Sequence, residues 1–577
     1  MAWSAVSSAV NTIGNLLAQE AVYLWGVEEQ VDRLQTELKW MQSSLIEADA
    51  KQSKDRRIRL WVAEIRELAY DAEDVIEDFA LRIGSRRNGS LSSCIKRSAC
   101  ILKDGRKLHE TRSKIDNIFT RITDLVRRLQ AYGIKELREE EGPSALAERR
   151  ESRRPYPHII EDNIVGLDTD IEKLVSVIVN EKSIVLSEEE DGNEGSISED
   201  LAERYLMELV ERCMLQVRER GIANLKIKSV QMHDLMRNLC LSKAKQENFL
   251  CFVDESNASS ISTVRRMHRV SAPDLLWIRR ITSPNLRSLL FFCEISEESI
   301  NQMKGFRKPV LRQMLNYLED HKDEAENGYL YGSIVVFLLF FVVIPEFQRF
   351  YKYMFNNFKF LRVFSYEGKG FSGTMGWKLS SDIGNLIHLR FLSLRGSFLC
   401  LPSSLGNLRC LQTLDLRADN GVFVPNVIWR MEKLRHLYLP EDYGVLTKLK
   451  LGTLRNLQTL VNFNTENCYL KDLMNMTNLR ELEIRGPFRI KDFNAEDLHK
   501  NPPIIRSKYL HSLSIFNDAG RIDPRHLNHL LSSCDNISRL SLDVEISELP
   551  ECHHLSPDLA YIHLERCKLK EDPMPKL

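Results

Sequence analysis

The first 132 residues carry four stripes of apolar positions at helical spacing. One stripe has a 4-3-4-3-4 spacing and comprises Val27, Val31, Leu34, Leu38, Met41 and Leu45. The other three lie at residues 6–17, 62–79 and 108–129, with a Gly/Ser-rich break at 84–93. Because each stripe gives a helix one apolar face, the pattern predicts an N-terminal four-helix bundle over residues 1–132.

Residues 361–577 repeat one short apolar pattern, L-x-x-L-x-L. An earlier copy begins at Leu286, and successive starts from 361 onward are 22–31 residues apart. The later copies begin at Leu361, Leu389, Leu411, Leu434, Leu457, Leu479, Leu510, Ile537 and Leu559. This period is typical of leucine-rich repeats, in which every unit adds one short strand to a continuous sheet. The pattern predicts a C-terminal α/β solenoid of leucine-rich repeats over residues 265–577.

Alternation along each strand buries the leucines and exposes the residues between them on the concave face of the array. Mixed aromatic and charged side chains on such a face favour protein binding over a catalytic pocket. A solvated sheet face without a partner is the alternative interpretation. The predicted partner-binding residues are Phe391, Asp415, His436, Tyr438, Glu481, Glu483, Arg539, Tyr561 and His563.

An atypical insertion interrupts the array at residues 301–347. It contains eleven consecutive apolar residues, 334–344, which Pro345 ends. A helix needs about 20 apolar residues to cross a bilayer, and the run extended back to Leu330 has only 15, so we expect no stable membrane span. An exposed segment of this composition would favour aggregation.

No phosphate-binding loop of the form G-x-x-x-x-G-K-[ST] occurs in the chain. The pair Gly368-Lys369 lacks both the upstream glycine and a following Ser or Thr. Without that loop there is no backbone cradle for phosphates and no hydroxyl for Mg²⁺. The sequence therefore predicts a protein that is not an enzyme, with no catalytic residues and no cofactor.

Composition and charge exclude several classes of function. Lys plus Arg number 80 and Asp plus Glu 81, so a net charge of −1 gives no general attraction to nucleic acid. The 12 cysteines form no C-x-x-C pair, which argues against zinc sites and a disulfide framework, and we expect no metal. The N-terminus lacks the basic start and apolar core of a signal peptide, so a cytoplasmic location is expected.

Three motifs connect the chain to a known family. Residues 70–78, Tyr-Asp-Ala-Glu-Asp-Val-Ile-Glu-Asp, resemble the acidic EDVID-type signature in the coiled-coil domain of plant intracellular immune receptors. Residues 164–168 resemble the entry to that family's nucleotide-binding domain, and Met232-His233-Asp234 matches the MHD motif of its winged-helix subdomain. With its repeats, the chain resembles the plant coiled-coil nucleotide-binding leucine-rich-repeat (NLR) disease resistance proteins over most of its length.

The resemblance implies a domain order with one part missing. It assigns 1–132 to an Rx N-terminal-like bundle, 133–157 to a charged linker, 158–181 to a truncated start of the nucleotide-binding domain and 185–250 to a small α winged-helix remnant. Some 65 residues separate Val165 from Met232, too few for the phosphate-binding and helical domains expected between them. An internal deletion or a mis-spliced gene near 181–184 accounts for this.

The resemblance also implies a function in plant defence, through protein recognition by the repeats and without a working nucleotide switch. One alternative is an ADP- or ATP-binding switch, in which His233 would sense the bound ADP as it does in intact family members. Another is a non-catalytic scaffold or a non-functional truncated product. The implied partners are a pathogen effector, a guarded host protein or another NLR, with weak self-association through the bundle.

In the family, the acidic motif docks onto arginines of the receptor's own repeats. Glu73, Asp74, Glu77 and Asp78 have the spacing that places carboxylates along one side of a helix. Arg395 and Arg417 follow the third leucine of consecutive repeats and should lie about 5 Å apart along the array. We expect these two groups to dock; two unrelated solvated patches are the alternative.

Overall fold

The structure is a computed structural model that describes residues 2–572 with gaps, of which the longest are 132–197, 272–284, 295–343 and 488–503. The predicted linker at 133–157, the truncated start of the nucleotide-binding domain at 158–181 and most of the insertion at 301–347 lie outside the described residues. The chain divides into two compact units. One comprises Met1–Met214 with Met236–Lys243, and the other comprises Leu215–Leu235 with Ala244–Leu577.

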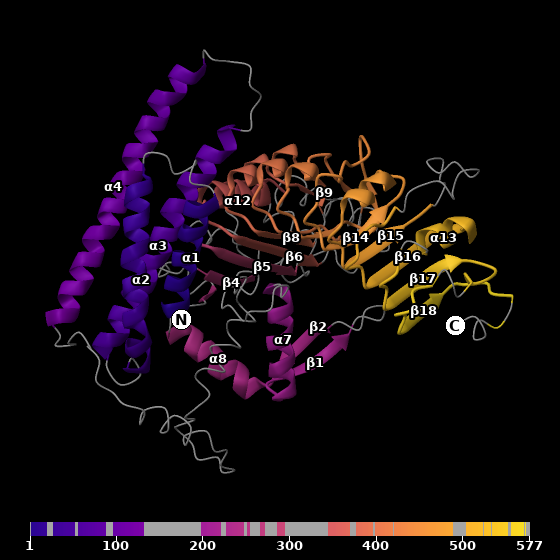
Figure 1. Ribbon diagram of the computed structural model, residues 1–577, viewed down its shortest axis with the longest axis horizontal. Helices are drawn as coiled ribbons and strands as arrows, with labels where there is room; N and C mark the ends of the chain where they lie inside the picture. The colour runs from indigo at the N-terminus through magenta and orange to yellow at the C-terminus, as the bar shows by residue number, and fades with distance from the viewer. Residues whose placement is uncertain are drawn as a thin grey trace, which may run out of the picture. The chain divides into compact units, whose positions relative to one another are not determined.

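The N-terminal helical domain contains α1 (Ala2–Gln19), α2 (Glu28–Lys51), α3 (Arg56–Arg87) and α4 (Lys96–Ala131) (Figure 1). Their apolar faces meet in one buried cluster, which contains side chains from all four predicted stripes. Every member of the 4-3-4-3-4 stripe on α2 is at most 1% exposed. Helix α3 extends to Arg87, into the Gly/Ser-rich segment where the sequence predicts a break.

The segment that follows consists of α7 (Ser198–Glu211), β1 (Leu215–Arg220), β2 (Ile227–Met232) and α8 (Asp234–Gln246). Strands β1 and β2 pair antiparallel, so the predicted winged-helix remnant contains a β-hairpin beside its helices. Valines face each other in this pairing, Val217 opposite Val230, and β-branched residues favour extended backbone. Cys213 lies two residues after the end of α7, and its φ of 58° is one that glycine adopts more readily.

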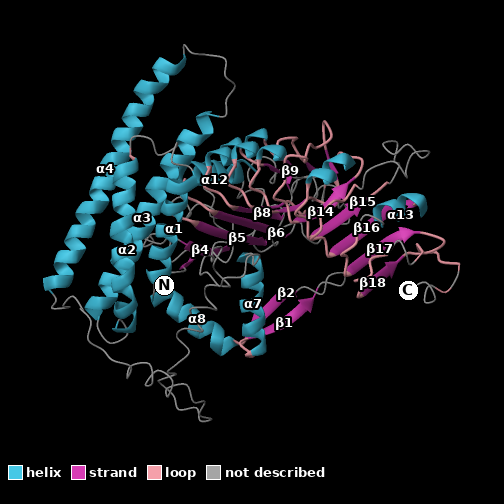
Figure 2. Cartoon of the chain, in the orientation of Figure 1, coloured by secondary structure: helices cyan, strands magenta, loops and turns pink. Residues whose placement is uncertain are grey.

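The repeats form a 12-stranded sheet in which all neighbouring strands are parallel (Figures 1 and 2). Each L-x-x-L-x-L copy coincides with one strand. The sheet also extends to Cys251, before the start predicted at 265, through strands that lack this pattern. Its strands are β3 (Cys251–Val253), β4 (Arg266–Ser271), β5 (Ser288–Glu294), β6 (Val363–Lys369), β8 (Phe391–Arg395), β10 (Thr413–Asp415), β12 (His436–Tyr438), β14 (Thr459–Asn464), β15 (Glu481–Arg485), β16 (Ser512–Arg521), β17 (Arg539–Glu545) and β18 (Tyr561–Glu565).

A second layer of short elements lies on the other side of the repeat core. It includes a four-stranded parallel sheet, several single 3₁₀ turns and two helices. The strands are β7 (Trp377–Lys378), β9 (Phe398–Cys400), β11 (Val422–Phe423) and β13 (Tyr443–Gly444). The helices are α12 (Ile344–Asn357) and α13 (Pro524–Leu531), and the turns are η8 (Ser381–Asn385), η9 (Ser403–Asn407), η10 (Ile428–Arg430) and η11 (Leu470–Asn475).

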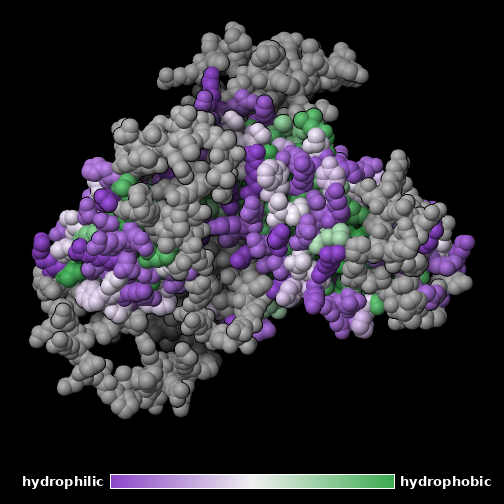
Figure 3. Space-filling view, turned by 45° about the horizontal axis from the view of Figure 1, so that its top comes forward, coloured by the Kyte–Doolittle hydropathy of each residue, from purple (hydrophilic) through white to green (hydrophobic). Residues whose placement is uncertain are grey.

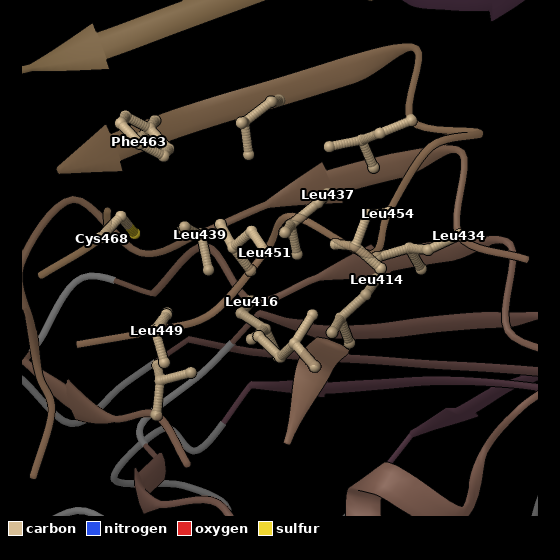
Figure 4. Close-up of a cluster of buried hydrophobic side chains, with 14 of the residues drawn as sticks. Leu414, Leu416, Leu434, Leu437, Leu439, Leu449, Leu451, Leu454, Phe463 and Cys468 are labelled. Atoms are coloured by element: carbon tan, nitrogen blue, oxygen red, sulfur yellow. The ribbon is translucent and has the colours of Figure 1, made fainter. Parts of the chain in front are cut away.

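The core of the array is a continuous column of leucines between the two layers. Figure 4 shows Leu414, Leu434, Leu437 and Leu454 pointing toward one another, and each of them is fully buried. Helix α12 adds Tyr351, Met354 and Phe355 to the same cluster, and Phe358 directly after the helix also belongs to it. The C-terminal end of the predicted insertion therefore belongs to the array. Pro345 lies in the first turn of α12, where its missing N–H costs nothing.

The described surface seen in Figure 3 is mainly hydrophilic, with small hydrophobic areas between charged residues. None of the helices within the described parts of the chain is both long and apolar enough to cross a bilayer. Residues 334–343, which carry most of the uninterrupted apolar run, lie outside the described residues.

Candidate protein-binding surface

The nine predicted partner-binding residues occupy two rows across the 12-stranded sheet. The strand register aligns the first position of each strand, which places Phe391, His436, Glu481, Arg539 and Tyr561 in one row. Two positions further along, the second row contains Asp415, Tyr438, Glu483 and His563. Eight of these side chains are partly exposed, so this side of the sheet can meet a partner.

Asp415 is the exception, because it is buried where alternation predicts exposure. Its carboxylate accepts hydrogen bonds from Arg395 Nε at 2.9 Å and Nη2 at 2.7 Å, and from Arg417 Nε at 3.0 Å and Nη2 at 2.7 Å. Burial alone would raise the pKa of Asp415, but these hydrogen bonds and the two positive charges outweigh it and lower the pKa. The carboxylate therefore stays ionised and holds both guanidinium groups in place.

Tyr438 lies beside this cluster, at the next strand. The guanidinium carbon of Arg417 is 4.4 Å from the centre of the Tyr438 ring, a distance at which a cation is attracted to the ring face. Burial raises the pKa of Tyr438 to about 12, so its hydroxyl stays protonated at neutral pH. Tyr438 offers a partner an aromatic edge and a neutral hydroxyl.

An acidic group lies further along the sheet. Glu483 pairs with Arg485 at 3.4 Å, and Arg485 also reaches Glu441 at 3.4 Å and packs on the Phe516 ring at 4.7 Å. Burial raises the pKa of Glu483, although the charge of Arg485 opposes this rise. Asn462, at a bulge in β14 with φ 60°, accepts a hydrogen bond from Arg485 Nε at 2.6 Å. The described charges on this side of the sheet thus change from basic at β8 and β10 to acidic at β15.

At the C-terminal end of the sheet, charged side chains pair with one another. Asp543 accepts hydrogen bonds from Arg566, and His563 Nε2 lies 3.4 Å from a carboxylate oxygen of Glu565. Sequence reasoning missed Arg566, which lies two residues after the last leucine of its repeat pattern and has a φ of 53°. A non-glycine residue in this conformation gives no recognisable signal in a single sequence.

Sequence reasoning also missed a row of arginines, each of which immediately precedes the first-row position of its strand. Backbone hydrogen bonds join Arg362 N–H to the Arg287 carbonyl and Arg390 N–H to the Arg362 carbonyl, both at 2.7 Å, and Gln412 and Gln458 continue the ladder between the later arginines. The repeated Leu-Arg pair at the start of several copies is the signal that would have revealed it. The arginines of this row are Arg287, Arg362, Arg390, Arg435 and Arg480.

The acidic residues predicted to dock are placed on α3. Glu73 is fully buried and accepts hydrogen bonds from Thr12 at 3.1 Å and from Ser8 at 3.4 Å, both on α1. Asp78 pairs with Arg82 at 2.6 Å, one turn further along the same helix. Asp74 and Glu77 are also buried. This side of α3 is therefore not a simple solvated face, and the docking of these residues onto Arg395 and Arg417 stays a prediction.

His233 is exposed and immediately precedes α8. Its Nδ1 accepts a hydrogen bond from the backbone N–H of Leu235 at 3.3 Å, which satisfies one of the free N–H groups at the start of the helix. The histidine of the MHD-like motif thus caps a helix in this structure. Across the described parts of the chain, no group of three or more His, Cys, Asp or Glu side chains is arranged to hold a metal ion.

Comparison with known proteins matches three separate parts of the chain to protein families. Residues 5–126 match the Rx N-terminal domain, residues 168–240 the disease resistance protein winged helix domain, and residues 341–577 a leucine-rich repeat region. The winged-helix match begins at 168, inside the segment that the sequence assigns to the truncated nucleotide-binding domain. A leucine-rich-repeat protein of Leptospira interrogans is similar at 15% identity with a TM-score of 0.28, over 57% of this chain and 88% of that one.

Relatives of this chain carry disease resistance names. The chain is 32% identical over 397 residues to the probable disease resistance RPP8-like protein 4 of Arabidopsis thaliana, and 33% identical over 393 residues to the probable disease resistance protein RXW24L of the same plant. Each alignment covers 67% of this chain and 37% of the relative, so the chain spans little more than a third of these proteins. With its Rx N-terminal, winged helix and leucine-rich-repeat domains in this order, the chain belongs to the coiled-coil NLR type of plant disease resistance proteins.

Proposed function

We propose that the protein acts in plant defence as an immune receptor-like protein that recognises another protein with its leucine-rich repeats. The observation that carries this proposal is the concave surface, where partly exposed aromatic and charged side chains stand in two aligned rows. Aromatic residues and arginine are the residue types that contribute most to protein interfaces. The disease resistance names of the relatives support the biological setting.

The proposed mechanism does not use a nucleotide switch. The chain contains no phosphate-binding loop, and His233, which would sense ADP in an intact family member, caps helix α8 instead. In this proposal, the protein would act through the binding of a partner to its repeats alone, without nucleotide exchange. The protein is proposed to be a binding protein rather than an enzyme, to work in the cytoplasm, and to bind a pathogen effector, a guarded host protein or another NLR.

Two finer features belong to the same proposal. We propose that α1–α4 form a four-helix bundle that supports weak self-association.

Docking of Glu73, Asp74, Glu77 and Asp78 onto Arg395 and Arg417 would add an intramolecular contact. To test this contact, fragments 1–132 and 260–577 are produced separately and mixed. They should associate, and the association should be lost when Arg395→Glu and Arg417→Glu are combined.

Restriction of pathogen growth in plants tests the proposed function. A line with the gene disrupted should support more growth of at least one pathogen in a panel, and the intact chain should restore resistance. Tyr561→Ala, in the first row of the concave surface, should fail to restore it. Tyr509→Ala is the matched control, because this tyrosine is 61% exposed and precedes strand β16. Equal restoration by both variants would contradict recognition through this surface.

A further inference from the structure

We propose that β18 is a dimerisation edge of the repeat array, where two copies of the chain join their sheets by pairing β18 with β18 in antiparallel orientation. Among the described strands of the 12-stranded sheet, β18 has one neighbour, β17, and its other edge meets no strand (Figure 1). Such an edge is a template for a further strand, because it presents a row of backbone N–H and C=O groups. This surface differs from helices α1–α4, for which weak self-association is proposed.

The apolar column of the array is incompletely covered at β18. The strand register places Ile562 beside Leu540 and Leu564 beside Leu542. The two leucines of β17 are at most 1% exposed, whereas Ile562 and Leu564 are only partly buried. Other apolar side chains of this repeat are also only partly buried: Leu555, Leu559, Cys567 and Leu569. A second apolar layer against this end would therefore remove further apolar surface from water.

The backbone of β18 offers a self-complementary set of hydrogen-bonding groups. Tyr561 donates its N–H to the carbonyl of Ser538, the residue before β17, at 3.0 Å. Because the N–H and C=O groups of successive residues alternate in direction along a strand, those of Ile562 and Leu564 point away from β17. In an antiparallel pair, Ile562 can exchange both hydrogen bonds with Leu564 of the second copy, and Leu564 with Ile562 of the second copy.

The conformation of Arg566 favours one register. Its φ of 53° takes the chain out of the extended conformation directly after β18, so the strand pairs over its 5 residues alone. Pairing centred on His563 uses all of them and places Ile562 opposite Leu564 of the second copy. Opposite residues in an antiparallel pair lie on the same face of the sheet, so the apolar side chains of the two copies continue one column.

The polar face of β18 is also complementary to itself. In this register, Tyr561 lies opposite Glu565 of the second copy, so a phenol that can donate a hydrogen bond faces a carboxylate at both ends of the pair. Nearby charge is already balanced within one copy, since Lys568 pairs with Glu545 at 3.1 Å. Pairing of identical strands about a two-fold axis closes after two copies, whereas pairing of β18 with the opposite edge of the array would build an open chain.

Sedimentation equilibrium of the full-length chain under reducing conditions tests the dimer. We expect the average mass to rise reversibly with concentration, from that of one chain to that of two. Leu564→Lys should weaken the association at least about tenfold, because it places a charge among apolar side chains at the joined edge. Leu446→Lys is the matched control, since it makes the same substitution at a side chain that is 88% exposed, and it should change the association by less than about twofold.

A disulfide cross-link tests the register and does not depend on the folding of the lysine variant. In a pairing centred on residue 563, His563→Cys places two thiols directly opposite each other, within reach of a disulfide. Glu565→Cys places them about 14 Å apart along the strands. We expect mild oxidation to give a covalent dimer of His563→Cys. Glu565→Cys should give no more than the intact chain, whose 12 cysteines set the background.

Several results would overturn the proposal. The mass of one chain at every concentration would exclude the dimer, and so would equal effects of the two lysine substitutions or equal cross-linking of the two cysteine variants. Dimerisation that appears only after removal of residues 573–577 would assign the edge to the chain's own C-terminal segment. A dimer that resists Leu564→Lys and gives no cross-link with His563→Cys would place self-association on another surface.

Discussion

Replacing Leu437 with alanine is expected to lower the free energy of unfolding of the repeat array by about 3 kcal/mol. Leu437 lies on the central strand β12, is fully buried, and packs among leucines of neighbouring repeats (Figure 4). Because each repeat is stabilised by its two neighbours, a cavity there weakens both interfaces of the repeat. Urea denaturation followed by circular dichroism measures the change.

Leu446→Ala provides the matched control, since the same three carbon atoms are removed from a side chain that is 88% exposed. We expect a change within about 0.5 kcal/mol for this variant. Similar destabilisation by both substitutions would mean that the column of leucines is not the core of the array.

The second large effect is expected from Asp415→Asn, which should destabilise the protein by about 2 kcal/mol at pH 7. The substitution removes the charge from a buried carboxylate that accepts hydrogen bonds from two arginines, and leaves the guanidinium groups to repel each other. Asp442→Asn, at an exposed aspartate, is the control and should have little effect. Denaturation midpoints of the two variants are compared with that of the intact chain.

The pH dependence of this effect has a definite sign. The pKa of Asp415 is lowered in the folded protein, so its contribution is complete above the pKa of the unfolded chain, about 4. The contribution is lost as the pH falls through the folded pKa. The difference between the intact chain and Asp415→Asn should therefore be constant near neutral pH and shrink below about pH 4. A difference that grows on acidification would exclude the ion pairs as its origin.

The sequence contains enough information to predict the repeats strand by strand. Each copy of L-x-x-L-x-L is a strand of the parallel sheet, because leucines at this spacing can be buried only when neighbouring repeats stack. The helical stripes were equally informative, since their apolar residues fill the core of the N-terminal domain. Strand β4 begins at the start predicted near 265, but β3 lies before it and carries no such pattern, so this first strand could not be read from the sequence.

The details of the candidate site depend on contacts between neighbouring elements. Arg395 and Arg417 were identified together as a basic pair and Asp415 separately as an exposed residue, and the burial of Asp415 between them follows only when the strands are aligned in register. Glu73 likewise finds its partners Ser8 and Thr12 through the rotation of α1 against α3. A single sequence gives the period of a helix but not the rotation of one helix against another.

Calorimetric titration of the purified chain with Mg·ATP and with ADP tests the central claim of the proposed function most directly, namely that the chain works without a nucleotide switch. The account predicts no saturable heat of binding for either nucleotide, because the chain has no loop to cradle the phosphates. A saturable isotherm with a micromolar dissociation constant for ADP or ATP would contradict it.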